Sequence, residues 1–323
     1  MLQPASLPNL SRISLKCEAT RAIPTFQEFS NLRIVSFLGS SHRQELKPFK
    51  DKPLPWTGLT YFQRNYEVSI QLLGLLRTTL SYLWLNVDVA CLRDFTEALA
   101  YLSVLETLHL FIELKGLSPS LLQSILDSPV RGQSNVRKVD VVSICNPWTV
   151  MSGHPFHGDP KTFWDWLLLR ISNTEELRLP FVLDSTMVSL RNLRKLRRFY
   201  CGYTILYHLR EIGFCSSLQE LTLECGAVTF LMLSSETVHK LAITFTEAHA
   251  IDFLALKWPS LTTLKLRLTF EYTSEPTTFD LPQLREIEVD GVATVGHYSD
   301  PLAGLGPVQG TVLGTFTILS LVP

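Results

Sequence analysis

The chain has 323 residues, of which 46% are hydrophobic and 18% are charged, and its formal net charge is -1. This composition supports a continuous apolar core, and the balanced charge excludes a general electrostatic attraction to nucleic acid or to an anionic membrane. The N-terminus lacks the basic and apolar segments of a secretory leader, and no window reaches the roughly 18 apolar residues of a membrane span. We therefore expect a cytoplasmic or nuclear protein that does not enter the membrane.

One apolar pattern, L-x-x-L-x-L, recurs along the chain, and its clearest copy is Leu218, Leu221 and Leu223 in the stretch CSSLQELTLEC. Leu221 and Leu223 are two residues apart, so they lie on one side of a short strand while Glu220 lies on the other. A unit of some 20 to 29 residues cannot bury such a side alone. The pattern therefore predicts stacked repeats.

The first apolar position of each unit is called its anchor. In chain order the anchors read from the sequence are Leu10, Leu32, Leu59, Leu80, Leu105, Val136, Thr174, Leu196, Leu218, Val238, Leu261 and Leu284. Most are followed by apolar residues three and five positions on, but Leu59 is followed only by Phe62 and Thr174 is itself polar. Segments with helical spacing, such as residues 66–80, 117–128 and 249–259, lie between anchors, so strand, turn, helix, turn is the expected order.

These repeats predict one α/β leucine-rich-repeat solenoid over residues 1–290. We expect a curved horseshoe with a parallel sheet on its concave side and short helices and loops on its convex side. Residues 143–159 contain closely spaced glycine and proline, and we interpret them as an inserted loop. The next stretch begins with Pro160 and predicts an amphipathic helix, whose shared face would carry Phe163, Trp164, Leu167, Leu168 and Ile171.

The C-terminal tail, residues 291–323, differs from the repeats. Its only charged side chain is Asp300. We expect an atypical and poorly ordered tail, whose last apolar run is too short to span a membrane. A lipid-anchor signal is the alternative, although no secretory leader accompanies it.

The cysteines of the chain include no C-x-x-C pair, and several fall at or beside expected strands. A thiol acts there as a small apolar group. We therefore predict free thiols in a reducing compartment for all six, which are Cys17, Cys91, Cys145, Cys201, Cys215 and Cys225.

The amino-acid sequence of the repeats resembles that of one family. Stretches such as FSNLRIVSFLG, LPWTGLTYF, WPSLTTLKLRL and LPQLREIEVDG are similar to the degenerate repeats of fungal F-box proteins, where a Pro-Trp or Pro-x-Leu step leads into each strand. The resemblance covers about Leu7 to Asp290, and it implies the substrate-recognition part of a cullin-RING ubiquitin-ligase receptor. An F-box would precede the repeats in such a protein, whereas the first repeat here begins by Leu10. We therefore do not expect this chain alone to bind the ligase adaptor, and a leucine-rich-repeat scaffold unrelated to ubiquitination is the alternative.

No residue pattern in the chain predicts a catalytic or cofactor site. His154, His157 and Asp159 lie close together, but we interpret them as a solvated loop rather than a metal site. The chain contains no G-x-S-x-G, H-E-x-x-H, P-loop or G-x-G-x-x-G motif. We therefore predict a non-catalytic protein without a metal or cofactor, and an enzyme would need the loop 143–159 to close over a pocket.

A basic cluster lies at Arg191–Arg198. It could attract phosphate or an acidic peptide if it lined the concave side, and this is a second functional alternative. We favour the interpretation that this segment leads into a strand with its basic side chains in solvent. Leu193, Leu196 and Phe199 would then point inward. Nucleic-acid binding is therefore not expected.

The expected binding surface follows from the repeat numbering. With the anchor as position one, positions three, five and seven face away from the core, giving the sets Tyr82/Trp84/Asn86, Thr107/His109/Phe111 and Lys138/Asp140/Val142. Strands about 4.8 Å apart would merge these sets into one patch, and Tyr and Trp are enriched at binding hot spots. We predict a concave protein-binding patch that contains Tyr61, Tyr82, Trp84, His109, Phe111, Lys138 and Tyr200.

This patch would grade into a negative C-terminal half, because the units containing Glu220/Glu224 and Glu286/Glu288/Asp290 are acidic. We expect a monomer whose partner is another protein. The alternative is that a loop or the C-terminal tail covers Trp84 and Phe111, which would then be part of the core.

Overall fold

The computed structural model describes the repeating part of the chain. The described residues are 6–16, 26, 28–38, 54–61, 66–88, 92–113, 120, 123, 127, 134–143, 166–182, 190, 192–204, 216–225, 235–245, 258–268 and 282–291. The chain divides into two compact units, Met1–Thr174 and Glu175–Pro323. Each unit is described by itself.

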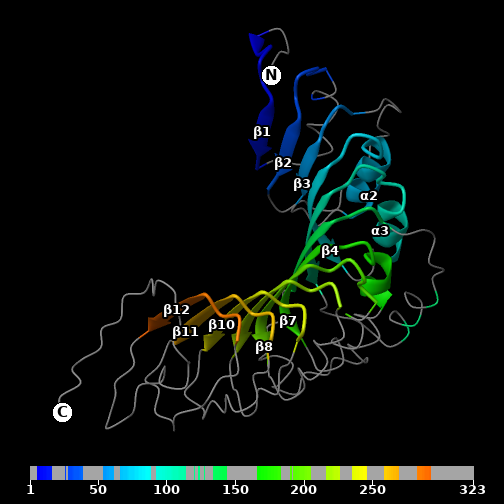
Figure 1. Ribbon diagram of the computed structural model, residues 1–323. Helices are drawn as coiled ribbons and strands as arrows, with labels where there is room; N and C mark the ends of the chain where they lie inside the picture. Colours follow the sequence, from blue (N-terminus) through cyan, green and yellow to red (C-terminus); the bar gives the residue numbers. More distant parts are fainter. Residues whose placement is uncertain are drawn as a thin grey trace, which may run out of the picture. The chain divides into compact units, whose positions relative to one another are not determined.

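The first unit contains a parallel sheet whose strands lie side by side in chain order. They are β1 (Arg12–Leu15), β2 (Ile34–Phe37), β3 (Gly58–Tyr61), β4 (Tyr82–Asp88), β5 (Thr107–Glu113) and β6 (Lys138–Ser143). Parallel neighbours need a crossover between them. Helix α2 (Tyr66–Leu75) forms part of the crossover from β3 to β4, and α3 (Leu92–Leu99) part of the one from β4 to β5. The two helices pack against each other, and α3 packs against β4 on the same side of the sheet (Figure 1).

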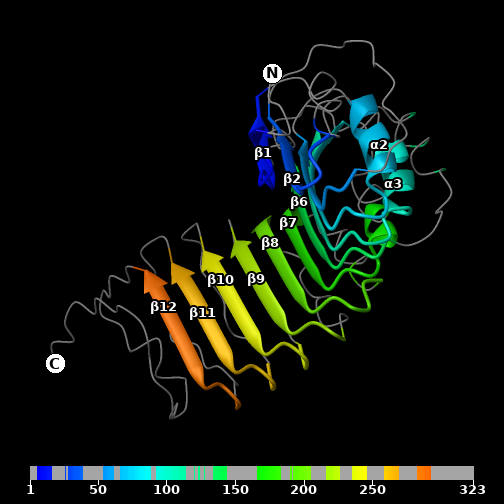
Figure 2. The same cartoon turned by 90° about the horizontal axis from the view of Figure 1, so that it is seen from above.

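The second unit repeats the parallel arrangement, again with each strand beside its neighbour in the sequence (Figure 2). Its strands are β7 (Glu176–Val182), β8 (Arg198–Thr204), β9 (Glu220–Cys225), β10 (Lys240–Phe245), β11 (Thr263–Leu268) and β12 (Glu286–Gly291). Strand β8 departs from regular pairing with β9, because the register shifts between Cys201 and Tyr203. Gly202 is the extra residue of this bulge, where the absence of a side chain eases the local bend.

The core of each unit consists of the anchor and the residues three and five positions after it. Leu80, Leu83 and Leu85 are buried in the first unit, as are Leu218, Leu221 and Leu223 in the second. Register pairing places the residues three and five positions after the anchor in continuous rows from strand to strand. The prediction of a repeat solenoid with a parallel sheet is confirmed at this level.

One anchor was assigned wrongly from the sequence. The first position of the third repeat is Trp56 rather than Leu59, because Trp56, Leu59 and Tyr61 are all fully buried at positions one, four and six. Leu59 pairs with Leu83 and Tyr61 with Leu85. The search for a leucine at position one missed an indole that fills the same space. With Trp56 as the anchor, the spacing is regular: 24 residues separate Leu32 from Trp56, and 24 separate Trp56 from Leu80.

A second repeating feature ties neighbouring repeats together through the residue just before the anchor, which is often Asn, Ser or Thr. Its side chain donates a hydrogen bond to a backbone carbonyl of the preceding repeat, and we call this contact a stitch. The stitches are Asn31 to Pro8 at 2.7 Å, Thr79 to Leu54 at 2.9 Å, Asn135 to Ser103 at 3.2 Å, Asn173 to Ser134 at 3.1 Å, Ser217 to Leu196 at 2.8 Å and Ser260 to Glu236 at 2.6 Å. Each provides a hydrogen bond to a backbone carbonyl that lies outside the described strands.

The backbone reinforces the same connection where each strand begins. One carbonyl of a repeat accepts hydrogen bonds from two consecutive N–H groups of the next repeat. The Thr57 carbonyl, for example, accepts from Ser81 at 2.9 Å and Tyr82 at 3.0 Å. The His239 carbonyl does the same for Thr262 at 2.8 Å and Thr263 at 3.0 Å. The stitches and these shared carbonyls hold the strand starts in register.

The predicted helix after the inserted loop is described over residues 166–170, which are helical. Leu167, Leu168 and Ile171 are buried, as the amphipathic pattern predicts, and so is Arg170. The Arg170 guanidinium lies 3.8 Å from the ring centroid of Trp166. Burial lowers the pKa of Arg170 to about 10, while the Glu97 carboxylate on α3 opposes that shift.

Several predicted features lie outside the described residues: the inserted loop beyond Ser143 with its His154, His157 and Asp159, the positions Phe163 and Trp164, and the tail beyond Gly291. Among the cysteines, Cys201 is a buried thiol. Within the described parts of the chain, the helices are all too short or too polar to cross a membrane.

Candidate functional site

The candidate site lies on the outer face of the first unit, which we define as the side of the β1–β6 sheet opposite the buried anchors. Strand register arranges its residues in rows. The first row is Arg12, Ile34, Gly58, Tyr82, Thr107 and Lys138, and the second is Ser14, Ser36, Thr60, Trp84, His109 and Asp140. A third row contains Asn86, Phe111 and Val142. The three sets predicted from the sequence therefore meet in register.

Three aromatic rings are in contact at the centre of this face, and we call Tyr82, Trp84 and His109 the aromatic cluster. The His109 ring centroid lies 5.3 Å from that of Tyr82 and 5.6 Å from that of Trp84. These separations are typical of interacting aromatic rings. Trp84 is nevertheless 38% exposed, which is unusual for an indole in the middle of a sheet.

A carboxylate orients the histidine of the cluster. His109 Nδ1 lies 3.1 Å from Asp140 Oδ2 on the next strand, and both side chains are largely but not fully buried. A carboxylate accepts hydrogen bonds, so this contact places a proton on Nδ1. The cluster thus combines aromatic rings with a carboxylate that holds the imidazole in place.

Gly58 lies between Ile34 and Tyr82 in the first row, and a side chain at this position would meet both at ordinary van der Waals distances. A Cβ at Gly58 would lie 3.4 Å from a side-chain carbon of Ile34 and 3.8 Å from the Tyr82 ring. Burial raises the pKa of the Tyr82 hydroxyl; the nearby Arg12 charge lowers it and the Asp140 charge raises it. Both charges are therefore within electrostatic reach of the cluster.

Two other residues of the predicted patch lie beside the cluster. Phe111 is half-buried in the third row next to Asn86, and Lys138 is exposed at the start of β6. Trp84 is 38% exposed and Phe111 is half-buried, so neither is among the buried core residues.

Tyr61 does not belong to the patch. It is fully buried and its ring lies 6.1 Å from that of Phe37, so the prediction that it faces outward is wrong. The error follows from the wrong anchor, because Tyr61 is at position six of its repeat rather than at position three. Burial also raises the pKa of its hydroxyl far above the usual range.

Tyr200 lies on strand β8 of the second unit. Its ring is covered by Arg178, whose guanidinium carbon lies 4.1 Å from the ring centroid. The Tyr200 hydroxyl donates a hydrogen bond to Glu224. Burial, followed by the contact with Glu224, raises the pKa of Tyr200 to about 12. Tyr200 is thus already held between an arginine and a glutamate of its own unit.

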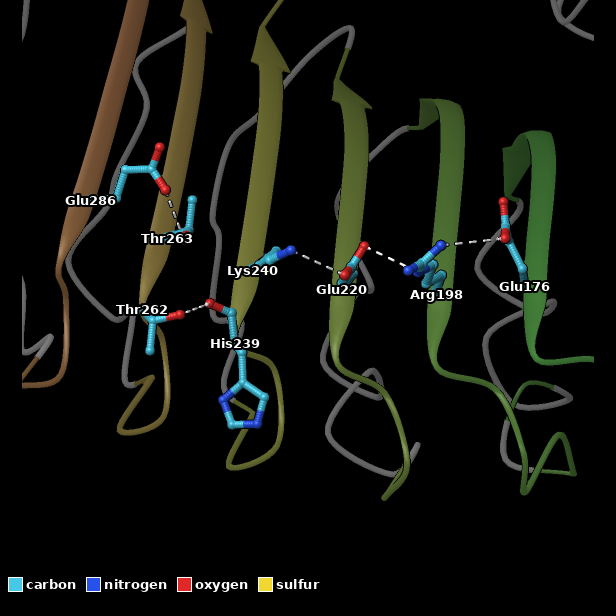
Figure 3. A network of polar contacts seen from close by, with 8 residues as sticks. All are labelled: Glu176, Arg198, Glu220, His239, Lys240, Thr262, Thr263 and Glu286. Carbon is cyan, nitrogen blue, oxygen red and sulfur yellow. Dashed lines mark hydrogen bonds and ion pairs between the residues drawn. The ribbon is translucent and has the colours of Figure 1, made fainter. Parts of the chain in front are cut away.

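The outer face of the second unit carries alternating charges along its rows (Figure 3). Arg198 lies between Glu176 at 3.7 Å and Glu220 at 3.3 Å, and Lys240 contacts Glu220 at 3.3 Å. Further along, Thr263 donates to Glu286 at 3.2 Å, and Lys265 pairs with Glu288. The predicted negative half is therefore wrong. The acidic residues are present, but the positive charges of Lys240 and Lys265 on the intervening strands balance their negative charges.

Among the described residues of the basic cluster at Arg191–Arg198, Arg198 alone lies on this face. Leu193, Leu196 and Phe199 are buried, as predicted. Arg194, Lys195 and Arg197 are exposed in the turn before β8, and Arg198 alone stands in a described strand, between two glutamates. Arg191 lies outside the described residues.

Sequence reasoning missed two features that the structure shows. The stitches carry a visible signal, an Asn, Ser or Thr immediately before the anchor. The contact between His109 and Asp140 follows only once the strands are in register. Within the described ranges, no group of three or more His, Cys, Asp and Glu side chains could hold a metal ion. In comparisons with known proteins, no family model matches this chain and no curated protein matches it.

Proposed function

We propose that this chain is a non-catalytic protein-interaction module that binds a protein partner over the outer face of its first unit. The exposure of Trp84 within the aromatic cluster is the observation that carries this proposal. Exposed aromatic rings supply large contact area with little loss of rotamer entropy, and Trp and Tyr dominate binding hot spots. A rigid sheet presents these rings already in place, which lowers the entropic cost of association.

We further propose that the solenoid is of the leucine-rich-repeat type. Three features support this proposal: the L-x-x-L-x-L core positions, one strand per repeat, and helices or turns that return the chain to the next strand. The resemblance to the repeats of fungal F-box proteins extends it to a function, because such a surface would recognise the substrate of a ubiquitin ligase. A scaffold unrelated to ubiquitination would use the same surface, and the identity of the partner distinguishes the two.

The test uses the full chain as bait in a chemical cross-linking pull-down, and then measures the affinity of the captured protein. The double variant Trp84→Ala and Phe111→Ala should weaken binding by at least about 2 kcal/mol, which is about thirtyfold in Kd. Its melting temperature should change little, because one side chain is exposed and the other is half-buried.

Tyr101→Ala is the matched control. Tyr101 is 63% exposed in the turn after α3, so it is an exposed aromatic residue outside the outer face. Its removal should leave binding unchanged. The proposal fails if the double variant binds the partner as tightly as the unmodified chain, or if it unfolds rather than specifically losing affinity.

A further inference from the structure

We infer that the partner places a carboxylate against the outer face of the first unit, between Arg12 and the aromatic cluster. This inference rests on the proposed function and specifies what the partner presents there. Three hydroxyl side chains lie next to one another in the second row of that face: Ser14 on β1, Ser36 on β2 and Thr60 on β3. We call them the hydroxyl row. Because neighbouring strands are about 4.8 Å apart, the hydroxyl row spans about 10 Å.

The second unit shows what the outward hydroxyl groups of such a sheet bind. Thr263 on β11 donates a hydrogen bond to Glu286 on the next strand at 3.2 Å, and Tyr200 on β8 donates one to Glu224 on β9. In the first two rows of the outer face of the first unit, strands β1 to β4 carry no carboxylate. The acidic residue of the second row is Asp140 on β6, three strands beyond β3. A carboxylate from a partner would supply the acceptor that the adjacent strand supplies in the second unit.

The side chains of the second row change in size and exposure from strand to strand. Ser14 is exposed, Ser36 is 7% exposed and Thr60 is half-buried. The Trp84 indole follows Thr60 in register on β4. A partner side chain that reaches the hydroxyl row would therefore lie beside the aromatic cluster, within the surface that the proposed function assigns to the partner.

Positive charge lies at the start and the end of strand β1. Arg12 is exposed at its first position, and Lys16 is exposed just after its last. Burial raises the pKa of the Tyr82 hydroxyl, the Arg12 charge lowers it, and the Asp140 charge, which has the smaller effect of the two, raises it. The Arg12 charge therefore outweighs that of Asp140 at this hydroxyl. Because its pKa is raised, Tyr82 stays protonated at neutral pH and can donate a hydrogen bond.

A carboxylate matches these groups better than a neutral or a basic side chain does. Both of its oxygens accept hydrogen bonds, so it can bind a guanidinium group and neighbouring hydroxyls at once. A neutral amide would gain nothing from the Arg12 charge, and a lysine or arginine of the partner would be repelled by it. An acidic side chain and the C-terminal end of a chain share this chemistry, and the test distinguishes them.

The test uses three acetylated peptides with the full chain: tetraglutamate amide, tetraglutamine amide and tetraglutamine with a free C-terminal carboxylate. Glutamine keeps the size of glutamate but carries no charge. Binding is followed by NMR through the indole N–H signal of Trp84, which lies next to Thr60 in register. One of the two peptides with carboxylates should bind at least about tenfold more tightly than tetraglutamine amide. The peptide that does so identifies the carboxylate as that of a side chain or of a chain end.

Variants show whether the preferred peptide binds at the hydroxyl row. Arg12→Gln should weaken its binding by at least about fivefold, and Arg12→Lys, which keeps the charge but loses the planar guanidinium, should weaken it less. Thr60→Val keeps the shape of the side chain and removes its hydroxyl, so it should weaken binding by about threefold. Arg137→Gln is the matched control, because Arg137 is an exposed arginine just before β6 and outside the rows of the outer face. It should leave binding unchanged.

Two results would overturn the inference. The first is equal binding of all three peptides, and the second is an equal effect of Arg12→Gln and Arg137→Gln on the preferred peptide. If either occurs while the Trp84 and Phe111 double variant still loses the captured partner, the proposed function stands and only the choice of a carboxylate is refuted.

Discussion

Thr174 is the one polar anchor, and its replacement by valine should stabilise the protein. Its side chain is fully buried, and Oγ1 has no hydrogen-bond partner in the described chain. The hydroxyl has therefore lost its water without gaining a protein acceptor, which costs about 1–3 kcal/mol. Valine has nearly the same shape and no such group. We expect Thr174→Val to raise the free energy of unfolding by about 1–2 kcal/mol.

Two companion variants separate the hydroxyl from the methyl group of Thr174. Thr174→Ser keeps the hydroxyl and removes the methyl, so it should lower the free energy of unfolding by about 1 kcal/mol. Thr174→Leu would match most other anchors but adds volume at a packed position, so it should gain less than valine. The three variants should thus fall in the order valine, leucine, serine.

Urea unfolding, followed by circular dichroism and by tryptophan fluorescence, measures this order. The slope of the free energy against urea concentration should be the same in all variants, since none changes how much surface unfolding exposes. In a unit of this size, each kcal/mol should shift the melting temperature by about 2–4 °C. If Thr174→Val is no more stable than the unmodified chain at an unchanged slope, the buried hydroxyl is satisfied and the reasoning is refuted.

Three further predictions test other features. Asn135→Ala removes a stitch and should lower the free energy of unfolding by about 1 kcal/mol in the same urea assay; no loss would show that the stitch to Ser103 contributes nothing. Leu264→Asp places a charge at a fully buried core position and should cost several kcal/mol, so an unchanged melting curve would contradict the core assignment. Tyr200 should form its phenolate near pH 12 rather than at its ordinary pKa of 10.0, as measured by the absorbance lost in Tyr200→Phe. Because the folded state raises this pKa, the stabilisation is fully present below pH 10.0 and is lost as the pH rises through about 12.

The core of the fold could be predicted from the sequence because strand geometry has a period of two. Once Leu218, Leu221 and Leu223 are placed inward, the residues between them must face outward. The same strictness explains the error at Tyr61. Moving the anchor from Leu59 to Trp56 shifts the repeat numbering by three residues, so Tyr61 moves from position three, which faces outward, to position six, which is buried. The anchor was sought as a leucine, so the aromatic residue Trp56 was overlooked.

The candidate site was predictable in composition but not in detail. Tyr82, Trp84 and His109 could be assigned to one face from their positions within single repeats. The contact between His109 and Asp140 joins residues 31 positions apart, and it depends on the length of the crossover between β5 and β6. The charge pattern of the second unit was misjudged for a related reason. The charge of a row depends on every strand that it crosses, and the prediction considered Glu220 and Glu286 without Lys240, which lies between them.

The stitches have a consequence for how the chain can change in length. Anchors are separated by as few as 20 residues, between Leu218 and Val238, and by as many as 38, between Val136 and Thr174. Doubling a flexible connection costs only about 0.6 kcal/mol in loop-closure entropy, which is less than one well-formed hydrogen bond of about 1 kcal/mol contributes. The fixed residues around each anchor, such as Asn173 and Thr174, therefore hold a strand in register however long the preceding segment is. Insertions behind the sheet should accumulate freely, while a single inserted residue between a stitch and the end of its strand would shift the register of the face.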